Sequence, residues 1–165
     1  MRHSSLLSSL SSFARAATLL LLGSLGTPAW SALLPEATRT ELLQAVQQQF
    51  WGKARYADSS PVLPADEAER QRLPVSPAVA RQVMDVGELS GLAEWCDLDW
   101  QGHYLTLTTS ARRHGFTEKQ LAFIGVTHGA LQGFMARAMQ QRSCEDEQRQ
   151  RVAQLLRQSP NRSFP

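Results

Sequence analysis

Apolar residues recur every three or four positions along most of the chain, which is the spacing of one face of a helix. In the first such segment Thr38 and Glu41 form a capping box, and Gly52 stands where the apolar repeat stops. A connection with three prolines follows at residues 53–75, with room for one helical turn at 65–70. We therefore predict a helix from Thr38 to Gly52 and then a long Pro-containing connection.

The second predicted helix has a clear beginning. Ser76 is a favoured N-cap residue, and Pro77 occupies the first helical position, where a missing N–H costs nothing. An apolar stripe follows and extends to about Cys96. A third helix then begins after Asp97 or Asp99, since either aspartate can cap it.

The third segment is the most ambiguous of the five. Residues 104–109 alternate between polar and apolar side chains and are rich in threonine, as a strand would be. A capping aspartate precedes the segment, however, and Gly115 follows it as a helix-ending residue. We predict a helix here because both ends carry helix signals.

The last two predicted helices are also delimited by their caps. Thr117 with Gln120 forms a capping box for a helix over residues 118–141. Ser143 is expected to cap the next helix, and Pro160 lies just beyond its end. The fold class that follows is all-α, a compact bundle of four to five helices.

The N-terminal segment differs from the rest and predicts a secretory signal peptide over residues 1–31. Arg2 and Arg15 precede an apolar run at 16–25, and small residues stand three and one positions before a cleavage point after Ser31. A bilayer span needs about 20 apolar residues, so this run is too short to be one. A mitochondrial transit peptide is the alternative, since the segment is rich in serine and lacks acidic residues, but the compact leucine run favours export to a periplasmic or extracellular location.

Removal of this leader changes the charge of the protein. The full chain has 17 Lys and Arg against 15 Asp and Glu, and the loss of Arg2 and Arg15 makes the two counts equal. Residues 32–165 then form a single domain with a flexible tail at 159–165, and they contain no expected membrane span. No basic run is interleaved with aromatic residues, so nucleic acid is not an expected partner.

The only two cysteines, Cys96 and Cys144, predict one disulfide in an exported chain. The bond would close a loop of about 49 residues and stabilise the fold by roughly 4 kcal/mol in the chain-entropy estimate. It would join the end of the second helix to the start of the fifth, and so hold both ends of the hairpin between them.

Three glycines at four-residue spacing mark the helix predicted at 118–141. Gly125, Gly129 and Gly133 fall on one face, although each glycine costs about 1 kcal/mol in a helix interior. Few charged residues interrupt this helix, so we expect it to be the buried central element. His128 lies beside the glycine row.

Two interpretations of the glycine row remain open. In the first, the row receives a neighbouring backbone, and the second helix offers a mate because Gly87 and Gly91 are also four residues apart. In the second, the glycines leave a ligand groove with His128 at its edge. We favour packing, with His128 as a buried neutral core residue.

Asp99 and His103 form a weak candidate metal pair, because residues four apart on a helix can share one ion. The simpler interpretation is that Asp99 caps the third helix and His103 lies on its exposed side. We adopt it and expect no metal, since a pair without a third ligand rarely specifies a site. Motifs such as G-x-S-x-G, H-E-x-x-H and a phosphate-binding loop are absent from the sequence, so no cofactor is expected.

These observations predict an exported helical protein that acts by binding another exported protein rather than by catalysis. Periplasmic accessory, chaperone-like and immunity-type proteins are the classes that fit. The alternative is a small-ligand carrier or small enzyme that uses the groove at Gly125–Gly133 with His128.

Overall fold

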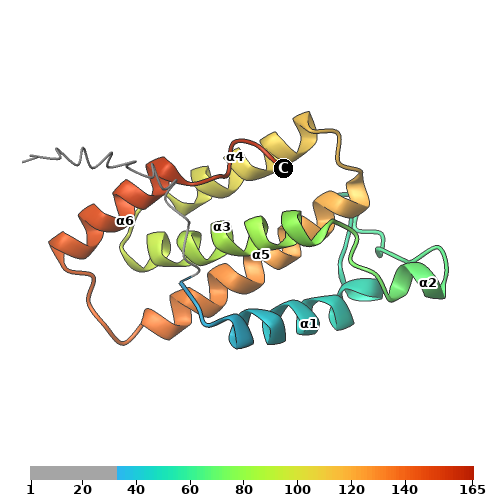
Figure 1. The fold of residues 1–165 in the computed structure, drawn as a ribbon, viewed down its shortest axis with the longest axis horizontal. Helices are drawn as coiled ribbons and strands as arrows, with labels where there is room; N and C mark the ends of the chain where they lie inside the picture. The colour runs from blue at the N-terminus through green and yellow to red at the C-terminus, as the bar shows by residue number, and fades with distance from the viewer. Residues whose placement is uncertain (1–32) are drawn as a thin grey trace, which may run out of the picture. The chain divides into compact units, whose positions relative to one another are not determined.

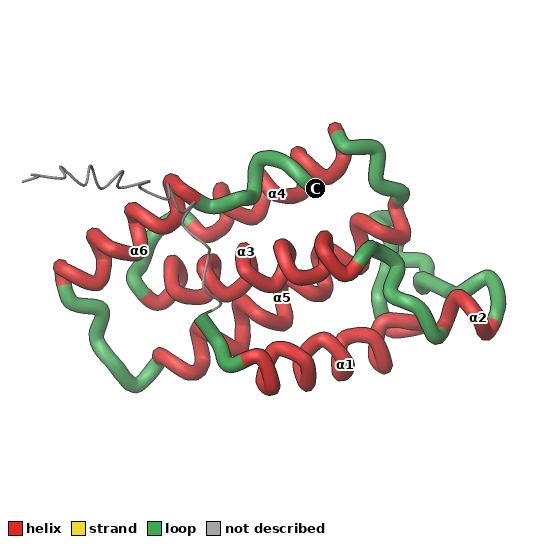
Figure 2. Tube along the Cα trace, viewed as in Figure 1, coloured by secondary structure: helices red, strands yellow, loops and turns green. Residues whose placement is uncertain are grey.

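A computed structural model describes residues 33–165, and the predicted leader at 1–31 lies outside this range (Figure 1). The described residues form helices joined by loops and contain no strand (Figure 2). The helices are α1 (Glu36–Lys53), α2 (Glu67–Arg70), α3 (Pro77–Trp95), α4 (Trp100–Arg113), α5 (Glu118–Met139) and α6 (Asp146–Gln158). The all-α prediction is confirmed over this range, and α2 is the helical turn expected inside the long connection.

The helix α3 is the centre of the described residues. It packs along α5 and also contacts α4 and α6, whereas α1 packs on α5 (Figure 1). The main core lies where α1, α3, α4 and α5 meet, and Phe50 and Phe123 interlock there edge to face with ring centroids 5.2 Å apart. Both phenylalanines are fully buried, as the apolar repeat requires.

Two glycines of α3 allow the close approach of α5. A Cβ atom added at Gly87 would lie 2.8 Å from the carbonyl oxygen of His128. One added at Gly91 would lie 2.5 Å from the carbonyl oxygen of Gln132. The backbone of α5 thus occupies the space that side chains at these two positions would need.

The predicted caps of three helices are confirmed. The Ser76 hydroxyl accepts from the Val79 N–H of α3 at 3.2 Å, and the Asp99 carboxylate accepts from the Gly102 N–H at 2.8 Å. Thr117 and Gln120 form the expected capping box at the start of α5. Each of these signals is local, so the sequence alone is enough to locate it.

The predicted starts of the first and last helices are wrong. Helix α1 begins at Glu36 after Pro35, whose fixed φ of −56° suits a helix entry, and Thr38 lies inside the helix. Helix α6 begins after Glu145 rather than Ser143, because the Gln148 side chain accepts from the Glu145 N–H at 2.9 Å. The end of the first helix is confirmed, since Gly52 has a left-handed φ of +80°.

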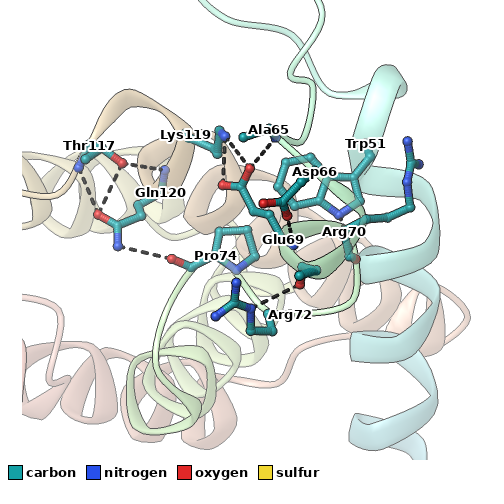
Figure 3. A network of polar contacts seen from close by, with 11 residues as sticks. Trp51, Ala65, Asp66, Glu69, Arg70, Arg72, Pro74, Thr117, Lys119 and Gln120 are labelled. Carbon is teal, nitrogen blue, oxygen red and sulfur yellow. Dashed lines mark hydrogen bonds and ion pairs between the residues drawn. The ribbon is translucent and has the colours of Figure 1, made fainter.

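The long connection at residues 53–75 is attached to the bundle by polar contacts (Figure 3). The indole N–H of Trp51 donates to the Arg70 carbonyl at 3.1 Å, and Lys119 Nζ lies 2.7 Å from the Glu69 carboxylate. Lys119 also lies over the Trp51 ring, 5.5 Å from its centroid. These contacts join the segment around α2 to both α1 and α5.

The C-terminal residues, expected to form a flexible tail at 159–165, pack against the bundle. Ser159 and Asn161 are buried, and the Gln82 side chain of α3 donates to the carbonyl oxygens of Pro160 and Ser163 at 2.6 Å each. Backbone carbonyl groups of the tail thus find a hydrogen-bond donor in a side chain of the bundle. Because this donor lies about 80 residues away in the sequence, the composition of the tail does not reveal the contact.

None of the helices at residues 33–165 is long and apolar enough to cross a bilayer.

Candidate functional site

The sulfur atoms of Cys96 and Cys144 lie at disulfide distance, as predicted. Their Cα atoms are 5.1 Å apart, and Cys96 is fully buried in a second small core with Leu89, Ala93 and Val152. The pair joins the end of α3 to the residues just before α6. It therefore connects two segments that are far apart in the sequence.

The glycine row of α5 faces away from α3. Nothing lies within 4 Å of a Cβ atom added at Gly129, which is exposed, and only the flexible end of Arg137 approaches Gly133, at 3.1 Å. The prediction that this row receives the glycines of α3 is wrong, because Gly87 and Gly91 meet the neighbouring face of α5 instead. The row forms an open strip.

Within this strip, Gly125 has a defined neighbour. A Cβ atom there would lie 3.0 Å from the hydroxyl of Tyr104, and the Tyr104 ring packs on His128 with centroids 4.6 Å apart. His128 itself is 2% exposed and faces α3, so it lies in the core as we expected. The structure thus separates buried His128 from the exposed Gly129 next to it.

A chain of hydrogen bonds connects four buried side chains from four parts of the fold. Ser90 Oγ of α3 lies 2.9 Å from His128 Nε2 and 2.8 Å from His103 Nδ1. The other ring nitrogen of His103, Nε2, lies 2.7 Å from Ser159 Oγ at the end of α6. The expectation that His103 lies on the exposed side of its helix is wrong, since this histidine is only 7% exposed.

The chain has two self-consistent arrangements of its protons. When the Ser90 hydroxyl donates to His103, His128 must donate to Ser90, and His103 donates onward to Ser159. When Ser90 donates to His128, every bond reverses. If one of the two histidines gains a proton, Ser90 can still donate to the other ring. If both histidines are protonated, the Ser90 hydroxyl has no acceptor left among these groups, so double protonation is disfavoured.

Burial determines the charge of both histidines. It lowers the pKa of His103 to about 4, although nearby Asp99 acts in the opposite direction. It likewise lowers the pKa of His128 to about 4, and His103 adds to that effect. Both rings are therefore neutral at pH 7 and act as hydrogen-bonding core residues.

Asp99 and His103, the weak candidate metal pair, have other partners in the structure. Asp99 caps α4, and both ring nitrogens of His103 are hydrogen-bonded to serine hydroxyls. No group of three or more His, Cys, Asp or Glu side chains that could hold an ion occurs within residues 33–165.

A buried ion cluster, which the sequence analysis missed, joins α1 to α3. Arg39 Nη1 lies 2.7 Å from Asp85 Oδ1 and 3.1 Å from Glu88 Oε1, and Arg39 and Glu88 are 2% and 0% exposed. Glu88 Oε2 also accepts from the backbone N–H groups of Leu33 and Leu34, at 2.8 and 3.2 Å. In the sequence, Glu88 interrupts the apolar stripe of its helix, and this interruption is the signal that could have indicated a buried charge.

Burial raises the pKa of Glu88, while the Arg39 charge and the N–H groups of Leu33 and Leu34 act against the rise. The carboxylate is thus held in the core at a cost in desolvation, which its partners offset only in part.

A surface groove of about 380 Å³ runs between α4 and the C-terminal tail. Its lining comprises one apolar side chain, three hydroxyl groups and two guanidinium groups: Leu105, Thr106, Thr109, Ser110, Arg113 and Arg162. Leu105 is 61% exposed, so its apolar side chain is available for contact from solvent. The groove therefore combines an apolar contact with positive charge.

The side of this groove formed by the C-terminal tail is held in place by contacts to His103, which belongs to the buried hydrogen-bond chain. Asn161 donates from Nδ2 to the His103 carbonyl at 2.9 Å, and Ser159 bonds the His103 ring. These contacts hold Arg162 beside α4. A second hollow of about 480 Å³ lies on α6 and is lined by charges of both signs together with Gln and Ala side chains, without a large apolar residue.

No protein-family model, curated protein or solved structure matches this chain.

Proposed function

We propose that the chain is an exported helical protein that acts by binding a partner protein in the same compartment. The leader pattern at residues 1–31 and the pair Cys96 and Cys144 support export, because disulfides persist in oxidising compartments. Accessory, chaperone-like and immunity-type roles are all forms of this activity.

The groove between α4 and the tail carries the proposal of binding. The guanidinium groups of Arg113 and Arg162 can each bind a carboxylate through paired hydrogen bonds. The exposed side chain of Leu105 adds an apolar contact in the groove between α4 and the tail. The complementary ligand is an acidic segment of the partner with an apolar side chain among its carboxylates. The hydroxyl groups of Thr109 and Ser110 offer further hydrogen bonds to such a segment, whereas the Thr106 hydroxyl donates to the Gly102 carbonyl within its own helix.

Peptide binding tests this assignment directly. The probe is a fluorescent octapeptide with a central leucine flanked by glutamates, and the control peptide has lysines in place of the glutamates. Fluorescence anisotropy with the oxidised protein should show binding of the acidic peptide alone, and the affinity should fall with salt because the contacts are charged.

A matched pair of charge reversals locates the site. Arg113→Glu with Arg162→Glu should weaken acidic-peptide binding about tenfold or more, equivalent to about 1.4 kcal/mol. Arg151→Glu with Arg157→Glu changes the same number of charges in the hollow of α6 and should have little effect. Equal binding by both double variants would show that the groove is not the binding site.

Export is tested separately, by fractionation of the native host and the intact mass of the purified protein. A mass that corresponds to residues 32–165 supports the leader assignment. Full-length protein retained in the cytoplasm would overturn it, whatever the peptide experiment shows.

A further inference from the structure

The C-terminal tail, residues 159–165, runs along α4 and contacts the buried histidine of that helix (Figure 1). The Ser159 hydroxyl lies 2.7 Å from Nε2 of the His103 ring, and Asn161 donates from Nδ2 to the His103 carbonyl at 2.9 Å. Ser159 and Asn161 are themselves buried. The tail therefore shields a titratable ring that belongs to the buried hydrogen-bond chain.

The rest of the tail is attached less firmly. Gln82 of α3 adds two hydrogen bonds to tail carbonyl groups, and Phe164 packs edge to face on Phe116 with ring centroids 4.9 Å apart. Both phenylalanine rings are only half-buried, and Arg162 and Ser163 are exposed. A segment with so little buried apolar contact detaches at a lower free energy than the bundle unfolds.

The groups around His103 decide what an added proton does. Ser90 of α3 and Ser159 of the tail present hydroxyl oxygens, and both can accept from a protonated ring. On the far side of Ser90, neutral His128 of α5 can take the Ser90 hydroxyl proton as an acceptor. Asp99 of α4 itself favours the positive charge. The hydrogen bonds thus tolerate a proton on His103, and desolvation is what opposes it.

Detachment of the tail removes this opposition. Water then reaches Nε2 of His103 in place of the Ser159 hydroxyl, and a solvated imidazole has an ordinary pKa of about 6.5. While the tail is attached, burial lowers the pKa of His103 to about 4, so a proton binds the detached form more tightly. The stability of the attached form is therefore complete above pH 6.5 and is lost as the pH falls toward 4.

We propose that the tail is an acid-released strap: a proton on His103 detaches residues 159–165 from α4 and takes Arg162 out of the binding groove. His128 does not control the release, because its ring bonds Ser90 rather than the tail. The release stands on the contacts of the tail alone, whereas its effect on the binding of acidic segments rests on the proposed function.

Hydrogen exchange of the Asn161 side-chain amide measures the release without any ligand. Its Nδ2–H group is buried against the His103 carbonyl and exchanges when the tail detaches. NMR of the oxidised protein gives the protection factor of this group relative to a free peptide of residues 159–165, which corrects for the pH dependence of exchange itself. Since the pKa of His103 is about 4 in the attached form and about 6.5 in the detached form, this factor should fall about 20-fold between pH 7 and pH 5.

Two substitutions make the test specific for one histidine. His103→Gln retains hydrogen-bonding groups but cannot gain a charge, so its protection factor should be the same at pH 7 and pH 5. His128→Gln removes the other buried ring and should leave the fall in place. If His103→Gln does not fold, Ser159→Ala takes its role: the His103 ring then lacks its tail contact already at pH 7, and the fall should be smaller than in the wild type.

A group in the core separates release of the tail from unfolding of the whole bundle. Leu131 is fully buried in α5, and exchange of its backbone amide requires the bundle to open. This amide should stay more protected than the Asn161 side chain at both pH values. Equal protection of the two groups, a protection factor of Asn161 that does not change with pH, or a fall that persists in His103→Gln would each overturn the strap.

Addition of the acidic octapeptide tests the link between the strap and binding. A ligand that binds only the attached form should raise the Asn161 protection factor about tenfold at a peptide concentration of about ten times its Kd. The control peptide with lysines should leave the factor unchanged. An acidic peptide that binds without raising protection overturns the regulation of the groove. An acidic peptide that does not bind overturns the proposed function and this regulation with it, while the exchange measured without ligand still decides the release of the tail.

Discussion

At the scale of single residues, the glycines of α3 and α5 have different structural roles. Gly87 and Gly91 face the α5 backbone at distances that leave no room for a methyl group, whereas Gly129 faces open space. The spacing of four residues is the same in both helices, so spacing does not distinguish the two roles. The environment of each glycine decides whether a side chain is tolerated.

Alanine substitutions should therefore have opposite effects at these positions. Gly87→Ala and Gly91→Ala force α3 and α5 apart, and each should lower the free energy of unfolding by about 1–3 kcal/mol. Gly129→Ala adds a better helix former without a clash and should raise it by up to about 1 kcal/mol. Urea denaturation of the three variants measures both effects, and a stabilising Gly91→Ala would contradict the packing described here.

At the scale of whole helices, the caps decide where the elements begin. Thr117 caps α5 through its hydroxyl, whereas Thr38 lies inside α1, which begins two residues earlier at Glu36. The same residue type thus has a capping role in one helix and none in the other.

These two threonines form a matched test. Thr117→Ala should lower the free energy of unfolding by about 1 kcal/mol through loss of the cap. Thr38→Ala should change it by less than about 0.5 kcal/mol, because no cap is lost. The same denaturation assay compares them; a larger loss at Thr38 would show that α1 begins there.

The disulfide that joins the end of α3 to the residues just before α6 gives the second prediction at this scale. Replacement of Cys96 and Cys144 by alanine should lower the free energy of unfolding by roughly 4 kcal/mol, since the closed loop no longer restricts the unfolded chain. Reduction of the wild type should produce a similar loss, and the double variant should not respond to reductant. An unchanged melting temperature after confirmed reduction would contradict a structural role for the bond.

At the scale of the whole molecule, acid should destabilise the fold. His103 and His128 have pKa values of about 4 in the folded protein against about 6.5 when unfolded, so the unfolded state binds more protons between these values. Stability is therefore complete above pH 6.5 and falls by up to about 1.4 kcal/mol per pH unit for each histidine as the pH falls toward 4. The raised pKa of Glu88 has the opposite effect, because the folded state then binds this proton more readily than the unfolded state as the pH falls. Since two histidines oppose one carboxyl group, the net effect of acid should be destabilising.

The free energy of unfolding, measured at pH 7, 6, 5 and 4.5, tests this dependence. His128→Gln removes one titrating ring and should reduce the slope. The same stability at pH 7 and pH 5 would show that the histidines are not buried as described.

Much of the fold followed from the sequence because its signals are local. Ser76, Asp99 and Thr117 cap their helices through contacts three residues away, and the apolar repeats are sufficient to predict the all-α class. The cysteine pair could also be predicted, because only two cysteines exist.

Only the tertiary structure decided which face of each helix meets which partner. The burial of His103, the orientation of the α5 glycines, the packing of the tail and the partners of Glu88 all depend on residues tens of positions away in the chain. A helical repeat is periodic around its own axis and contains no information about the neighbouring helix. For this reason the buried hydrogen-bond chain and the ion cluster became visible only when the helices were packed together.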